Sequence, residues 1–199
     1  MNLTLSTIAI FRRRWSHAPR RRQSDNSDIL LVFDFERQDN RFSYERLATM
    51  LKHFSESTDE GKLYINYPMV EACRHFAYLP DGGFFARRVA VEDTARYKEI
   101  VSEGPRYQSF VRDFSRDVAD AVIVAAGAKA LMLCGEEFSS SNLEEMLSRI
   151  DALEILVKER CLEEEHCVIP ALGTSLLFII DYSAGLIDFA RVCELAGVI

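Results

Sequence analysis

Two acidic residues, Asp34 and Glu36, follow directly on a run of five apolar residues at 29–33 and are separated from each other by Phe35. Such a run predicts a strand buried on both faces. Side chains two apart in a strand share a face, so both carboxylates would lie at the carboxyl end of the strand, where open α/β sheets bind ligands. Mutual repulsion between them would be relieved by a hard cation such as Mg²⁺ or Mn²⁺. The spacing therefore predicts a metal site, with Asp39 as a further ligand; a strand ending in a polar loop is the alternative.

A third acid, Glu71, is the candidate catalytic residue. Residues 62–67 predict a second strand, which Pro68 stops, and a short helix is expected over 69–77. If the two strands are neighbours, Asn66 and Glu71 reach the same sheet edge, and the helix dipole favours an anion in the first turn. A carboxylate site with open water positions suits Mg²⁺ or Mn²⁺ and can support phosphodiester cleavage. An ordinary glutamate at a helix start is the alternative interpretation.

The elements that must position these acids form a βαβα unit over residues 29–80. Ser43 is the expected N-cap of an amphipathic helix over 44–54, which would join a parallel pair of strands. Residues 81–199 are expected to be mainly helical. Helices are predicted over 92–101, 107–133, 141–157 (from a capping box of Ser141 and Glu144) and 175–180 (capped by Thr174), with a strand over 167–170. The expected fold class is α/β, with a small, mostly parallel sheet and a helical C-terminal half in one domain over 29–199.

Composition places few other limits on the chain. Its 199 residues are 48% hydrophobic and 28% charged, as in ordinary globular proteins. No apolar run approaches the roughly 18 to 20 residues that span a bilayer, so we expect a cytoplasmic protein without a membrane partner.

The five cysteines form no C-x-x-C pair; Cys161, His166 and Cys167 come closest to a metal cluster, and buried thiols are the alternative. The P-loop, the G-x-G-x-x-G fingerprint and the nucleophile elbow are all missing.

Residues 1–28 are expected to form a basic arm, either poorly ordered or containing an edge strand over 3–11. The first 24 residues contain six arginines and no acid. Because the net charge of the whole chain is −7, the rest of the chain carries a charge of −13. Such a body would not attract nucleic acid by bulk charge, but the arm could grip phosphate. An organellar targeting peptide is an alternative. The candidate nucleic-acid-binding residues are Arg12, Arg13, Arg14, Arg20, Arg21 and Arg22.

Residues 32–39, 42–43, 61–71 and 173–182 together resemble a group of uncharacterised bacterial proteins of about this length. A hydrophobic strand that ends in D-x-D and is followed by a helix, a strand and a glutamate is also similar to the TOPRIM domain. That domain occurs in topoisomerases, primases and OLD-type nucleases. The resemblance implies that Asp34 and Glu36 match the D-x-D pair and that Glu71 matches the later glutamate.

The chain departs from the TOPRIM pattern at one point. TOPRIM domains carry an essential glutamate upstream of D-x-D, whereas residues 1–28 contain only Asp25 and Asp28 as acids, too close to the strand for that position. We therefore expect either a degenerate, inactive site or an altered or truncated amino terminus.

Three functional hypotheses follow. The first is a Mg²⁺-dependent nuclease-like or nucleotidyl-transfer-like domain that acts on nucleic acid. The second is a non-catalytic interaction protein that uses amphipathic helices over 107–160 to bind a partner or to self-associate. A small-ligand sensor using the same strand ends is a third option.

Overall fold

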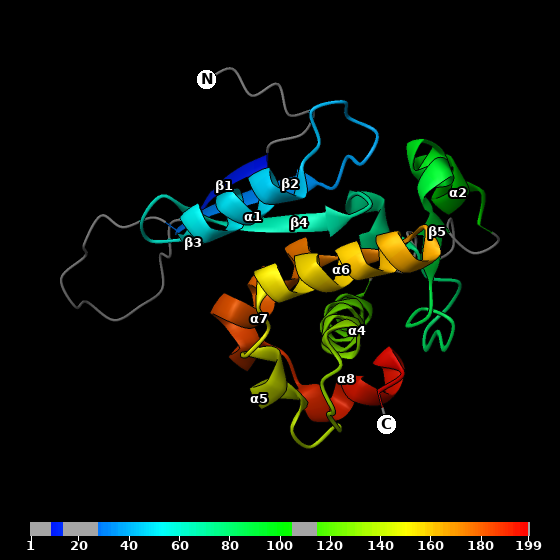
Figure 1. Cartoon of the computed structure of the whole chain (residues 1–199). Helices are drawn as coiled ribbons and strands as arrows, with labels where there is room; N and C mark the ends of the chain where they lie inside the picture. The colour runs from blue at the N-terminus through cyan, green and yellow to red at the C-terminus, as the bar shows by residue number, and fades with distance from the viewer. Residues whose placement is uncertain (1–8, 14–27, 105–114, 199) are drawn as a thin grey trace.

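A mixed five-stranded sheet lies against a group of helices in the computed structural model, which describes residues 9–13, 28–104 and 115–198 (Figure 1). Strand β2 (Asp28–Asp34) pairs with β1 (Ala9–Arg13) on one side and with β4 (Gly61–Tyr67) on the other. The short strands β3 (Ser55–Glu56) and β7 (Leu172–Gly173) both pair with β4.

The parallel pair β2–β4 is the part of the sheet that the sequence predicts. Its register places Asp34 opposite Asn66, so the two strands end side by side. Helix α1 (Tyr44–His53) joins them and begins where the Ser43 hydroxyl accepts a hydrogen bond from the Arg46 N–H. The α/β class is confirmed. A mostly parallel sheet is not, because β1, β3 and β7 are all antiparallel to their neighbours.

Helix α4 (Arg116–Cys134) is the centre of the helical half. Thirteen of its 19 residues are buried, and it packs against helices α5 to α8 (Figure 1). A helix that is apolar around its whole circumference is typically buried in the core. The apolar periodicity of this segment therefore reflects packing within the chain.

The remaining elements connect and cover these two parts. The small second sheet pairs β5 (Arg88–Ala90) with β6 (Val168–Pro170). The helices are η1 (Val70–Arg74), η2 (Val91–Arg96), α2 (Tyr97–Glu103), α5 (Leu143–Leu147), α6 (Ala152–His166), η3 (Thr174–Leu176), α7 (Leu177–Ser183), η4 (Ala184–Leu186) and α8 (Phe189–Ala196). No helix within the described ranges is both long and apolar enough to cross a membrane.

Two expectations for the C-terminal half are wrong. The helix predicted over 141–157 is two helices, because the Asp151 carboxylate accepts from the Leu153 N–H and caps a new helix at α6. The Ser141 hydroxyl pairs with Ser139 and caps nothing. The Thr174 hydroxyl, also expected to be a cap, donates to the Ile65 carbonyl and so ties η3 to the sheet.

Candidate functional site

The carboxyl ends of β2 and β4 meet the first turn of η1. The Asp34 carboxylate accepts a 2.8 Å hydrogen bond from the Val70 N–H, which joins the end of β2 to the start of η1. Asn66, at the equivalent end of β4, is fully buried, and its Oδ1 accepts a 3.1 Å hydrogen bond from the Ser175 N–H. These two hydrogen bonds therefore hold β2, the segment from β4 to η1, and η3 together at the carboxyl ends of the two strands.

Three carboxylates interact electrostatically at this point. Burial raises the pKa of Asp34, and repulsion from Glu71 and Glu36 raises it further, although the Val70 N–H and the Asn66 amide act in the opposite direction. Glu71 is only 7% exposed and lies 3.4 Å from the Arg74 guanidinium. Glu36 and Glu71 thus lie close enough to Asp34 for their charges to affect its pKa.

A thiol and a hydroxyl adjoin the acids. The Sγ of Cys73 lies 3.6 Å from the Oγ of Ser175. Burial raises the pKa of Cys73 to about 11, and the charges of Asp34 and Glu71 add to that effect, so the thiol is protonated at neutral pH. Gly173 makes this contact possible, because a Cβ there would overlap Cys73 Sγ and lie 3.2 Å from Cys73 Cα. Reasoning from the sequence did not identify Cys73 or Ser175, which lie 102 positions apart.

One polar atom of the site lacks a hydrogen bond. The Nδ2 of Asn66 is buried, and within the described ranges no acceptor meets hydrogen-bond geometry with it. Its amide nevertheless lies close enough to Asp34 to lower the pKa of that carboxyl.

The donor set fits Mg²⁺ or Mn²⁺ better than it fits zinc. Across the residues that the structure describes, no group of three or more His, Cys, Asp or Glu side chains is placed so that it could hold a metal ion. Mg²⁺ does not require such a group, because it keeps several water molecules and binds through one or two carboxylates. Asp34 and Glu71 could supply these two carboxylates, with Glu36 adding negative charge.

Asp39, the further predicted metal ligand, and His75, which follows η1, each have a partner of their own. The Asp39 carboxylate accepts hydrogen bonds from the backbone and side chain of Arg41 at the surface, and these bonds lower its pKa. The Nδ1 of His75 lies 2.8 Å from the Tyr97 hydroxyl, and burial lowers the pKa of this histidine to about 4, so the ring is neutral. His75 thus interacts with α2.

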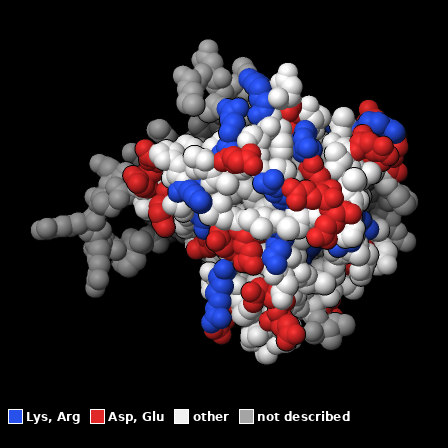
Figure 2. Space-filling model, viewed as in Figure 1, with Lys and Arg blue, Asp and Glu red and all other residues white. Residues whose placement is uncertain are grey.

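The basic arm lies largely outside the described residues. Arg12 and Arg13 belong to β1, and the backbone register of the sheet places them opposite Ile29 and Asp28 of β2. The other four predicted phosphate contacts, Arg14, Arg20, Arg21 and Arg22, lie outside the described ranges. On the face shown in Figure 2, basic and acidic side chains of the described chain are interspersed.

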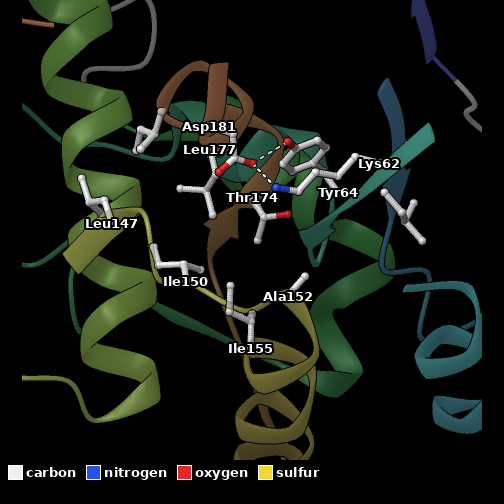
Figure 3. A pocket seen from close by; sticks show the side chains of 11 residues that line it. Lys62, Tyr64, Leu147, Ile150, Ala152, Ile155, Thr174, Leu177 and Asp181 are labelled. Atoms are coloured by element: carbon white, nitrogen blue, oxygen red, sulfur yellow. Dashed lines mark hydrogen bonds and ion pairs between the residues drawn. The ribbon is translucent and has the colours of Figure 1, made fainter. Parts of the chain in front are cut away.

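A small pocket toward the amino-terminal end of β4 carries a polar cluster that the sequence did not predict. The Asp181 carboxylate accepts hydrogen bonds of 2.5 Å from Lys62 Nζ and 2.7 Å from the Tyr64 hydroxyl (Figure 3). Below this cluster the walls are apolar and include Leu147 and Ile155. The cavity measures about 40 Å³, which is room for only a few water molecules. This cluster therefore joins α7 to the sheet.

Lys129 is a second polar residue that the sequence did not single out. It is 3% exposed in the middle of α4, and its Nζ donates three hydrogen bonds of 2.8 Å to the carbonyl oxygens of Phe84, Arg87 and Ala171. All three ammonium hydrogens are thus satisfied. The lysine joins α4 to the loop before β5 and to the residue before β7.

Comparisons with protein-family models, with curated proteins and with solved structures find no match to this chain.

Proposed function

We propose that this chain is a TOPRIM-like domain that binds Mg²⁺ or Mn²⁺ and cleaves phosphodiester bonds in nucleic acid. Asp34 and Glu71 are the proposed ligands. The observation that carries the proposal is the position of Asp34 at the end of a parallel pair of strands, where it accepts from the N–H of the residue before Glu71 and where the charges of Glu71 and Glu36 act on it. A divalent cation would relieve the repulsion among these charges.

The order of elements supports this proposal. Strand β2, helix α1, strand β4 and η1 occur in the same order as the strand, helix, strand and glutamate of the TOPRIM pattern. The two-residue strand β3 lies between α1 and β4. The mixed sheet and the lack of an upstream glutamate are the two departures from that pattern. Glu71, as a proposed ligand of the cation, would also position a cation-bound water for attack. The bound cation would lower the pKa of that water and neutralise charge on the phosphate.

The alternative, an interaction protein, has less support. It was suggested by the apolar periodicity of residues 107–160. Within this range α4 packs against α5 to α8, which accounts for its apolar residues. A monodisperse monomer in light scattering would argue further against self-association.

Isothermal titration with MgCl₂ and MnCl₂ tests the metal site. Asp34→Asn keeps an oxygen that can accept from the Val70 N–H, and Glu71→Gln keeps one near Arg74, so both variants remove charge with little change in shape. We expect each to weaken Mn²⁺ binding at least tenfold. The matched control is Asp39→Asn, whose carboxylate contacts Arg41 at the surface, and it should bind as the parent does. Equal affinity in all four proteins would rule the site out.

Cleavage of supercoiled plasmid DNA in Mn²⁺ tests the reaction separately. The parent and Asp39→Asn should nick the plasmid, whereas Glu36→Ala and Glu71→Gln should not. Metal binding without cleavage by the parent would limit the proposal to a degenerate, binding-only domain.

A further inference from the structure

Helices α1 and α6 meet at one hydroxyl group that contacts two carboxylates. The Tyr44 Oη lies 2.9 Å from Glu159 Oε2 and 2.8 Å from Glu163 Oε2. The two glutamates occupy adjacent turns of α6, and Tyr44 is the first residue of α1. These contacts involve none of the acids at the ends of β2 and β4.

The three oxygens of this cluster need two hydrogens between them to form two hydrogen bonds. A phenol has one hydrogen, so it can donate to only one of the two carboxylates. If both glutamates were ionised, the second carboxylate would face a phenol lone pair at hydrogen-bond distance, which is repulsive. A second hydrogen between Tyr44 and one of the glutamates, which would then be a neutral carboxylic acid, would remove this repulsion.

The surroundings indicate which glutamate is neutral. Glu163 accepts hydrogen bonds from Arg37 Nε at 2.7 and 3.0 Å, and a guanidinium stabilises the charged form. Glu159 is fully buried, and its second oxygen, Oε1, has no hydrogen-bond partner within the described part of the chain. An ionised carboxylate is costly in such a place. Burial and the charge of Glu163 raise the pKa of Glu159 to about 8, although the hydrogen bond with Tyr44 and the charge of Arg37 act in the opposite direction.

The other groups around Glu159 do not supply a buried positive charge. The elements packed against α6 are α1, α4 and β6, and the sheet lies near them. Arg160 lies over the ring of Tyr44 and pairs with Glu45 and Glu164 at the surface. Strand β6 carries no titratable side chain. The titratable and charged groups facing this cluster are Tyr44 and Glu45 from α1, Arg37 from the loop before it, Tyr67 from β4, Cys134 from α4, and Arg160 and Glu163 from α6 itself.

We propose that Glu159 holds a proton at neutral pH and that losing it loosens the contact between α1 and α6. The protonated acid donates to Tyr44, and Tyr44 donates to Glu163, so one continuous chain of hydrogen bonds joins the two helices. Deprotonation leaves two negative charges and one hydrogen, and the chain of bonds cannot be completed. The 37–43 loop is then affected too, because Arg37 attaches it to Glu163.

The sign of the pH effect follows from linkage. The pKa of Glu159 is raised from its ordinary value of 4.5 to about 8, so the folded chain holds a proton that the unfolded chain has released. Stability from this group is fully present below about pH 4.5 and is lost as the pH rises to about 8. Over that interval, the unfolding equilibrium constant should increase by up to tenfold per pH unit.

Carboxyl-detected NMR of the full chain labelled with ¹³C-glutamate tests the proposal directly. The Glu159 Cδ resonance, assigned through bonds from the backbone, should show its inflection between pH 7 and 9. An inflection between pH 4 and 5 would overturn the proposal. This readout is made on the parent protein and does not depend on whether any variant folds.

Hydrogen exchange of the α1 amides tests the consequence for the helices. Measured relative to α8, α1 exchange in the parent should rise at least fivefold between pH 6.5 and 9. Glu159→Gln carries a permanent N–H donor in place of the acid and should abolish that rise. The matched control, Glu164→Gln, removes an exposed glutamate of the same helix and should leave the rise unchanged. A rise that persists in Glu159→Gln would refute the proposed role of this proton.

Discussion

The carboxylate of Asp34 and the backbone N–H of Val70 form a 2.8 Å hydrogen bond between the end of β2 and the start of η1. This bond uses one carboxylate oxygen and lies directly beside Glu71. It therefore orients Asp34 at the end of β2. The same bond makes η1, and with it Glu71 and Cys73, depend on the end of the strand for its position.

The pKa of Asp34 should respond to divalent cations. Burial and two neighbouring acids raise this pKa above 3.8, so the folded state holds the proton more tightly than the unfolded chain, and stability from this group is lost as the pH rises through the folded-state pKa. A bound cation reverses the direction and should lower the pKa. NMR of ¹³C-labelled aspartate with and without MgCl₂ measures this, and Asp39 serves as the internal reference that should not move. An unchanged Asp34 titration at saturating Mg²⁺ contradicts the prediction.

Cation binding should also raise the thermal stability of the parent. At a free cation concentration 100 times the Kd, the stabilisation is about 2.7 kcal/mol. Differential scanning calorimetry at pH 7.5 should show a higher Tm in MgCl₂ than in NaCl of equal ionic strength. Asp34→Asn, which is expected to bind the cation at least tenfold more weakly, should show a smaller difference.

Gly173→Ala should displace η1 from β7. The added methyl group overlaps Cys73 Sγ and meets the Cys73 backbone, which cannot move without moving its neighbour Glu71. We expect a loss of about 1 to 3 kcal/mol in the free energy of unfolding, as for other overpacked sites. Urea denaturation measures it, and Mn²⁺ affinity should fall together with stability. Gly82→Ala is the control, since nothing lies within 4 Å of the new methyl group, and it should be neutral or slightly stabilising.

Lys129→Met should be among the most damaging substitutions in the chain. Methionine fills a similar volume, but the carbonyls of Phe84, Arg87 and Ala171 lose their donor, and an unsatisfied buried acceptor costs about 1 to 3 kcal/mol. We expect a total loss of about 3 kcal/mol or more in the free energy of unfolding. The control, Lys98→Met on the exposed face of α2, should stay within about 0.5 kcal/mol of the parent. A mild Lys129→Met phenotype would mean that water replaces the ammonium.

Local patterns were sufficient for β2, α1 and β4 because each carries its own signal. The apolar run before Asp34 predicts the strand, Ser43 predicts the cap, and Pro68 predicts the end of β4; the structure has all three. The proximity of Asp34 and Glu71 followed from the parallel pairing of these strands. That part of the site could be predicted because it depends on neighbouring elements alone.

The rest depends on contacts between residues distant in sequence. The periodicity of residues 141–157 is compatible with one helix, and only the Asp151 cap separates α5 from α6. Residues 168–170 were correctly expected to form a strand, but its partner, β5, was not foreseen. Glu159 lies on a helix with charged neighbours, and its burial depends on Tyr44, 115 positions away. No local pattern distinguishes such a glutamate from a solvated one.

The ion pair of Lys62 and Asp181 provides a test of how strongly α7 is held to the sheet. Both side chains are partly shielded, at 30% and 23% exposed, and the Tyr64 hydroxyl shares the same carboxylate. A double-mutant cycle with Lys62→Met and Asp181→Asn should give a coupling free energy of about 0.5 to 1 kcal/mol, and 1 M NaCl should reduce it. Arg96 and Glu99 form the matched control pair, which is 65% and 67% exposed and 3.6 Å apart, and its coupling should lie near zero. Equal coupling in the two pairs would show that the wall of the pocket in Figure 3 does not shield Asp181 from solvent.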